Sequence, residues 1–564
     1  MTSSPLVESS VSKNRLAEIV SFAVVAAVAA GVYALLFDRA NVLSHSIGYN
    51  LYASERVLVG DVPYRDFHTL YPPAIFYLNA VLFKWLGVSL FTALLGVFAF
   101  KFLTVAMIYL SARQVMSRAW ALLGALGSLL WLRPNGPFKS VPMHYGALFL
   151  AGALFFFLKY ENRKRLLFIF FAGASLGLVA LFKHNIGAYA LLGSFVLLAA
   201  EDSALNYRLG FNLRNYRRVL VLLIGCATTV VPMLAYMQLR GALVPMLRTI
   251  LFGPGEFLLN RLAIPLSPLA PAVLVVALSL GCYAAYSLRS RPSLGLAIWI
   301  ALIVAVGAFV LRANQADVNQ IIFYLPMLVL LCALIVVVFG KQVAIAERRA
   351  LLILFIFAAA ALMEVFPRFA REQSIAAMPF VMLVLIYLLF VLRARIKTLT
   401  GAAPQYRAAL AILPIAFVLM EGRVFFNTYF DDALQFKARS ELAIERGRRV
   451  YFPESTASLI DEVVNYVQQR VPPGGYAFAQ SDAGTSFLFL ADRRNISNAQ
   501  FWIGVGVTPE QRAATLERID KTQTKLIITS DDILAVEKYA PMREYIDRNF
   551  KETARFEDVV ILER

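Results

Sequence analysis

Residues 45–87 concentrate side chains that can carry out acid–base chemistry. The stretch contains two of the chain's four histidines, three acids, two arginines and a pair of adjacent prolines. Asp66 lies there in an irregular segment, because Pro63 and the later proline pair disfavour a continuous helix. Its carboxylate can act as a general base or hold a cation, or it can pair with Arg65 or cap a turn. We expect the functional role for Asp66.

A second group consists of cations that fall on one side of the predicted membrane. Lys183, which is followed by His184, is the strongest candidate for binding a ligand. Arginine and lysine pair with phosphate oxygens, so such cations suit a lipid phosphate or pyrophosphate, although a single one more commonly extends to lipid headgroups. The group comprises Arg65, Lys139, Lys183, Arg240, Arg248, Arg312, Arg368 and Arg371.

All four histidines fall on the side of the predicted membrane that also holds these cations. Histidine suits a membrane interface as well as metal ligation, and both explanations stay open. The histidines are His45, His68, His144 and His184, and Glu55 and Lys139 join them as accessory candidates.

The composition places these residues in a membrane protein. Hydrophobic residues make up 59% of the 564 and charged residues only 16%, and the mean hydropathy is +0.66, far more apolar than a soluble chain. The formal charge of +18 fits Lys and Arg gathered in cytoplasmic loops, and we expect no nucleic-acid partner. All three cysteines lie in apolar segments, which indicates neither a disulfide framework nor a metal site.

Apolar windows predict about thirteen membrane-spanning helices. Basic residues at alternate junctions belong on the cytoplasmic side, as does the N-terminus before an uncleaved first helix. An odd number of spans then places residues 38–87 and the C-terminal region outside. The windows are 16–37, 88–112, 119–132, 146–159, 165–182, 186–200, 218–238, 267–287, 294–311, 319–340, 350–366, 375–392 and 406–421.

The pattern changes after Arg423, so we divide the chain into a membrane domain, residues 1–423, and an extracytoplasmic α/β domain, residues 424–564. Helical and strand periodicities alternate in the second domain. The predicted helices are 455–471, 509–519 and 533–550, and the predicted strands are 476–479, 487–490, 526–529 and 559–562.

The chain resembles the GT-C membrane glycosyltransferases, in particular family 39-like bacterial enzymes akin to the aminoarabinose transferase and the protein O-mannosyltransferases. The motifs that carry the resemblance are Pro63-Tyr64-Arg65-Asp66 with Pro72-Pro73, the run from Gly173 to Gly187 that includes Lys183, and Phe366-Pro367-Arg368. Where the family has an Asp-Glu pair before the first-loop aromatic, this chain has His45-Ser46.

The resemblance implies an inverting transferase of the bacterial cytoplasmic (inner) membrane. It would move a sugar from a polyprenyl-phosphate donor to a lipid, glycan or protein acceptor at the outer face. Asp66 would be the base, Lys183, Arg65, Arg368 and His184 would contact the donor phosphate, and His68 or His184 could help to hold a divalent cation. Two alternatives stay open, a transporter or flippase of lipid-linked sugar and a non-catalytic relative.

Overall fold

The computed structural model of the protein describes most, but not all, of the chain. The three predicted spans 267–287, 294–311 and 406–421 lie outside the described residues, as do Lys139 and Arg368. The domain boundary at residue 423 also falls outside them and stays a prediction. The described residues are 15–36, 38–39, 45–132, 141–200, 213–259, 315–340, 343–365, 371–399, 439–480, 483–498, 507–531 and 539–564.

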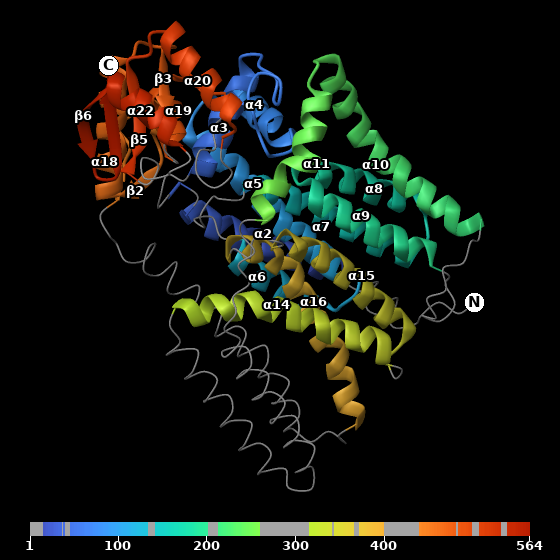
Figure 1. Ribbon diagram of the computed structural model, residues 1–564. Coiled ribbons are helices and arrows are strands. Elements are labelled where there is room, and N and C mark those ends of the chain that lie inside the picture. The colour runs from blue at the N-terminus through green and yellow to red at the C-terminus, as the bar shows by residue number, and fades with distance from the viewer. Residues whose placement is uncertain are drawn as a thin grey trace.

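The membrane part is a bundle of apolar helices (Figure 1). Each predicted span among the described residues overlaps one of them, whereas α11 (Leu243–Leu259) was not predicted. The helices that match predicted spans are α2 (Arg15–Leu36), α5 (Leu90–Ala112), α6 (Arg118–Trp131), α7 (Val141–Arg163), α8 (Leu166–Phe182), α9 (His184–Ala199), α10 (Leu213–Leu239), α14 (Gln315–Phe339), α15 (Ile345–Leu362) and α16 (Arg371–Leu399).

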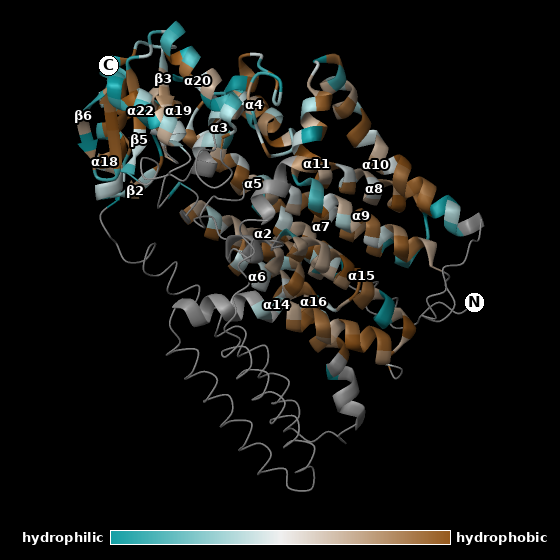
Figure 2. Cartoon of the chain, viewed as in Figure 1, coloured by the Kyte–Doolittle hydropathy of each residue, from teal (hydrophilic) through white to brown (hydrophobic). Residues whose placement is uncertain are grey.

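The bundle has the hydropathy of a polytopic membrane protein. Figure 2 shows α8, α9 and α10 largely in hydrophobic colours, while hydrophilic colours gather on the α/β domain. Four described helices are long and apolar enough to cross a membrane: Arg15–Leu35, Leu90–Ala112, Pro142–Arg163 and Asn215–Leu239. The helical membrane class is confirmed, and the number of about thirteen spans stays a prediction.

The first loop contains two helices separated by an irregular segment. Helix α3 (His45–Leu58) and helix α4 (Ala74–Leu86) pack against each other, and the prolines before Ala74 prevent the two from merging. Pro73 occupies the N-cap position of α4. The segment 59–73, which contains Asp66, is therefore a loop held at both ends by packed helices.

The α/β domain is a sheet covered on both faces by helices. In the order β4-β3-β5-β7-β6, strands β4, β3 and β5 are parallel, and β7 is antiparallel to both neighbours. Alternation along β5 sends Ile528 to the core with α18 and α19, and Ile527 to the core with α20 and α22. The elements are β3 (Tyr476–Ala479), β4 (Arg494–Asn495), β5 (Leu526–Ser530), β6 (Lys551–Phe556), β7 (Val559–Glu563), α18 (Glu454–Arg470), α19 (Gly484–Ala491), α20 (Pro509–Lys521) and α22 (Ala540–Asn549).

One predicted strand is wrong. Residues 487–490 form part of helix α19, and every residue of that helix is buried. A short apolar run that is buried on all sides has no distinguishing period, so its sequence fits a strand and a helix equally well. The other predicted strands are β3, β5 and β7, and the predicted helices 455–471 and 509–519 are α18 and α20.

The first loop and the α/β domain form one continuous hydrophobic core. Tyr49 and Phe76 of the loop and Phe487 of α19 belong to the same cluster of buried residues. Phe83 of α4 stacks on Phe489 of α19, with 6.0 Å between ring centroids. The α/β domain is thus seated directly on the loop that holds Asp66.

Candidate functional site

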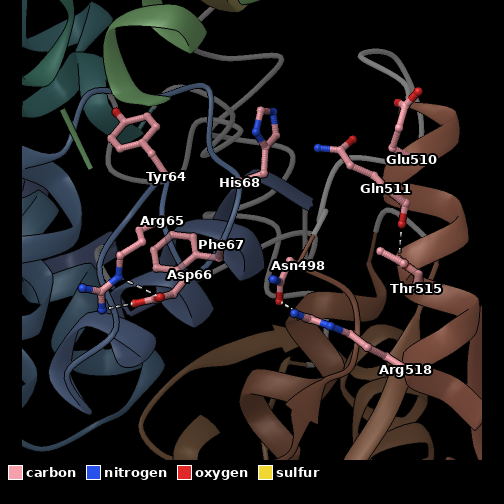
Figure 3. Close-up of a pocket in the computed structure, with 11 residues that line it drawn as sticks. Tyr64, Arg65, Asp66, Phe67, His68, Asn498, Glu510, Gln511, Thr515 and Arg518 are labelled. Carbon is pink, nitrogen blue, oxygen red and sulfur yellow. Dashed lines mark hydrogen bonds and ion pairs between the residues drawn. The ribbon is translucent and has the colours of Figure 1, made fainter. Parts of the chain in front are cut away.

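A cleft of about 330 Å³ lies between the first loop and α20. The loop contributes residues 64–68, which include the predicted site residues Arg65, Asp66 and His68. The α/β domain contributes Asn498 and one face of α20 (Figure 3). The structure therefore brings three predicted residues together at a junction between the two parts of the chain.

The loop at the cleft is held in an uncommon backbone conformation. Tyr64 has a φ of 70°, in the left-handed region that costs a non-glycine residue about 1–2 kcal/mol. Its amide donates to the Phe67 carbonyl at 2.8 Å, and its hydroxyl donates to the Tyr71 carbonyl at 2.5 Å. The ring is buried against α10 and α11. These contacts hold the turn that presents Arg65 and Asp66 to the cleft.

Asp66 is ionised and accepts three hydrogen bonds at the edge of the cleft. Arg65 donates from Nε to Oδ1 at 2.9 Å and from Nη2 to Oδ2 at 2.7 Å, and the Val62 amide donates to Oδ2 at 2.7 Å. The hydrogen bonds from Arg65 are the main reason that the pKa of Asp66 lies below its usual value. The same guanidinium reaches the Arg240 carbonyl at 3.1 Å, which ties the loop to the α10–α11 turn.

A divalent cation does not fit at Asp66 while Arg65 is paired with it. Both carboxylate oxygens face the guanidinium of Arg65, whose positive charge repels a metal ion. Across the part of the chain that the structure describes, no three His, Cys, Asp or Glu side chains gather as metal ligands.

His68 faces the cleft as a neutral side chain. Its backbone amide donates to the Asn498 carbonyl at 3.0 Å, which fixes the loop to the α/β domain. Burial lowers the pKa of the imidazole, so that at neutral pH one ring nitrogen is a donor and the other an acceptor. Figure 3 shows the ring between Tyr64 and Gln511.

Lys183 belongs to a separate buried cluster. It lies between α8 and α9, and its Nζ is 2.7 Å from Oε1 of Glu364, a carboxylate with a side chain only 3% exposed. Asn185 donates from Nδ2 to the other carboxylate oxygen at 3.0 Å. Sequence reasoning missed Glu364, which lies in η2 (Met363–Val365). The available signal was an acid inside a predicted apolar span.

Two aromatic residues link the cluster of Lys183 and Glu364 to the cleft. The Tyr71 ring lies 5.6 Å from Nζ of Lys183, and its carbonyl accepts the hydrogen bond from Tyr64, which lines the cleft. His184 follows Lys183 in the chain and begins α9, and His144 lies in the first turn of α7. Each keeps a buried Nδ1 with no hydrogen-bond partner among the described residues.

Among the described residues, Glu55 is an accessory candidate that does not line the cleft. Glu55 forms a bidentate ion pair with Arg446 of the α/β domain, at 2.8 and 2.9 Å. His45 is the first residue of α3. Sequence reasoning also missed the residues that α20 contributes, because their sequence shows only an amphipathic helix with a capping box at Thr508 and Gln511.

No protein-family model and no curated protein matches the chain, but solved structures resemble it. The Archaeoglobus fulgidus oligosaccharyltransferase tethered to an acceptor peptide aligns with a TM-score of 0.50 and 12% identity, over 95% of this chain and 72% of that one. The same enzyme with Zn and sulfate gives a TM-score of 0.49, 14% identity and coverages of 94% and 71%. ArnT from Cupriavidus metallidurans bound to undecaprenyl phosphate aligns with a TM-score of 0.46 and 14% identity, over 97% of this chain and 98% of that one.

At such identities the likeness concerns the fold alone, and the alignment at a TM-score of 0.50 extends over nearly the whole chain. It includes both the helical bundle and the α/β domain, in agreement with the architecture expected from the sequence. The chain has the fold of the GT-C membrane glycosyltransferases.

Proposed function

We propose that the protein is a glycosyltransferase that moves a sugar from a polyprenyl-phosphate donor to an acceptor at the outer face of the bacterial cytoplasmic membrane. The N-terminus would lie in the cytoplasm and the α/β domain outside. The observation that carries the proposal is the cleft that sets Asp66 against the α/β domain, in a chain with the GT-C fold. The sequence resemblance supports the same reaction.

In this reaction an acceptor hydroxyl oxygen attacks the anomeric carbon of the donor sugar. A new carbon–oxygen bond forms with inversion, and the bond from that carbon to the phosphate oxygen breaks. Its electron pair leaves with the polyprenyl phosphate. Asp66 accepts the proton of the hydroxyl as the new bond forms. Because the Arg65 side chain is 44% exposed, it can move aside as the acceptor enters.

The departing phosphate requires positive charge. Lys183 supplies it from the buried cluster, and Arg65 and Arg368 are further candidates. The unpartnered Nδ1 atoms of His144 and His184 are available for the phosphate oxygens, which would give these buried atoms partners. Glu364 holds Lys183 in place until the donor arrives.

Replacement of Asp66 by Asn tests the proposal. Purified protein is incubated with radiolabelled polyprenyl-phosphate sugars and a cell-envelope extract, and the label leaving the lipid is followed. Wild type should transfer label, and Asp66→Asn should lose about 10²–10⁴-fold of the rate, because amide oxygen is a far weaker base than carboxylate. Thermal melting checks that the variant is folded.

Asp61→Asn is the matched control, since Asp61 lies in the same loop and also forms an ion pair with an arginine, Arg56. Its transfer rate should stay near that of wild type. Transfer that survives Asp66→Asn would remove Asp66 from the base role. Donor binding without any transfer would instead favour the transporter or the non-catalytic relative.

A further inference from the structure

The cleft has a second wall that the proposed chemistry does not use. Glu510, Gln511, Ala514, Thr515 and Arg518 line it from α20. Their spacing of one, three, one and three residues places them along one face of the helix. Asp66 belongs to the opposite wall, so a molecule that fills the cleft lies between the loop with the proposed base and α20 (Figure 3).

Among the residues that the structure describes, the charges that line the cleft cancel. Its two arginines, Arg65 and Arg518, are matched by two acids, Asp66 and Glu510. The chain as a whole carries a formal charge of +18. A balanced cleft in so basic a protein gives no net attraction to an anionic ligand.

The described lining of the cleft includes both hydrogen-bond donors, such as Arg518 and Gln511, and carboxylate acceptors, Asp66 and Glu510. In Figure 3 the amide nitrogen of Gln511 points across the cleft toward His68. The oxygen of the same amide is used in the helix cap, where it accepts from the Thr508 amide at 3.0 Å. Arg518 hydrogen-bonds with one nitrogen to Asn498 Oδ1, and within the described part of the chain its other N–H groups are open to a ligand. Hydroxyl groups, which both donate and accept, match such a lining.

The size and position of the cleft identify which reactant it holds. A volume of about 330 Å³ is at the lower end of the roughly 300–1,000 Å³ of ligand pockets, enough for one or two sugar rings. The lipid of the donor must remain among the apolar helices. The group that Asp66 deprotonates belongs to the acceptor, and the acceptor must therefore reach the cleft.

We propose that the acceptor is an uncharged, hydroxyl-rich glycan whose terminal sugar binds between residues 64–68 and α20, with Gln511 and Arg518 as specificity-determining residues. This inference rests on the proposed glycosyl transfer. It selects one acceptor class from the three that the sequence leaves open.

Binding of glycans can be measured without turnover. Purified full-length protein in nanodiscs is applied to an array of immobilised glycans with either neutral hexose and N-acetylhexosamine ends or sulfated, phosphorylated and uronic-acid ends. Wild type should bind neutral glycans. The double variant Gln511→Ala/Arg518→Gln should bind them about 10–100-fold more weakly, because it loses one neutral and one charge-assisted hydrogen bond. Lys521→Gln, on the same helix and outside the cleft, should bind like wild type.

A kinetic measurement separates this inference from the proposed function. With donor saturating, the double variant should raise the acceptor KM about 10–100-fold, while Lys521→Gln, outside the cleft, should keep the wild-type KM. Binding restricted to anionic glycans, no binding to any glycan, or an unchanged KM would each overturn the inference. A wild type that binds neutral glycans and never consumes donor would overturn the proposed transfer and leave the glycan site intact.

Discussion

The most consequential side-chain pair that the fold creates is Lys183 with Glu364. Their side chains are only 18% and 3% exposed, and 2.7 Å separates Nζ from Oε1. A charge in such surroundings is stable only when it is paired, because removal from water costs several kcal/mol per ion. The pair thus keeps Lys183 charged in a place where an unpaired lysine would lose its charge, as the proposed contact with the donor phosphate requires.

A double-mutant cycle tests this pairing. Lys183→Met and Glu364→Leu should each destabilise the protein by about 3–5 kcal/mol, because each leaves a buried charge alone. The double variant should lose less stability than either single variant, because it leaves neither charge alone. Thermal melting of the four proteins in one detergent gives the cycle.

If the stability lost by the double variant equalled the sum of the two single losses, a direct pairing of Lys183 and Glu364 would be contradicted. Activity provides a second measurement, since the double variant should recover stability without recovering transfer. Restored transfer in the double variant would show that Lys183 is not needed for the donor phosphate.

At the scale of elements, α3 and α19 approach so closely that only glycine fits between them. A Cβ on Gly48 of α3 would lie 1.9 Å from Oγ of Ser486 and 2.4 Å from its Cα. The second contact is with backbone, so no rotation of the Ser486 side chain relieves it. This approach fixes how the first loop sits against the α/β domain.

Gly48→Ala should therefore destabilise the protein by about 1–3 kcal/mol and reduce transfer, because the two helices must separate to admit the methyl group. Gly31→Ala in α2 is the matched control: nothing lies within 4 Å of its Cβ position, and alanine should stabilise the helix by about 0.5–1 kcal/mol. The melting temperatures of both variants, compared with that of wild type, measure these changes in stability. Equal melting of Gly48→Ala and wild type would contradict the close packing.

At the scale of the whole molecule, the membrane part and the α/β domain are coupled through a shared core and polar contacts. Arg446 bonds Glu55 of α3 and also reaches the Phe489 carbonyl at 2.8 Å and Asp492 at 2.6 Å. The Asn495 amide donates to the Tyr52 hydroxyl at 2.7 Å. We expect the two parts to unfold together as one cooperative unit.

Two probes can follow the two parts separately. All three cysteines lie outside the α/β domain, so a thiol-reactive dye reports on the membrane helices, and limited proteolysis reports on the α/β domain. The transitions should coincide in wild type. In Arg446→Met, the protease should cleave the α/β domain at a lower temperature than the one at which the dye labels the membrane helices. The loss of the charged hydrogen bonds of Arg446 costs on the order of 2 kcal/mol.

Arg548→Met is the control for this prediction. Arg548 and its partner Glu544 are 79% and 70% exposed, and an exposed ion pair contributes about 0–1 kcal/mol. Separate transitions in wild type, or coincident ones in Arg446→Met, would contradict coupling through Arg446.

The sequence by itself determined the membrane class, most of the described helices and the irregular segment around Asp66. These features depend on hydrophobic period, run length and proline geometry, which act within a few residues of one another. Arg65 and Asp66 could be recognised as neighbours for the same reason, since they are adjacent in the chain.

Only the tertiary structure decided which side chains from distant parts of the chain contact one another. Glu364 reaches Lys183 and Asn185 from 179 or more positions away, and α20 meets residues 64–68 after more than 400. Residues 487–490 lie in a helix that is buried on all sides and packs against α3. Their apolar run therefore had no period that could distinguish a helix from a strand. Contacts of this kind depend on how packed elements fit in space, and no local pattern of side chains encodes that fit.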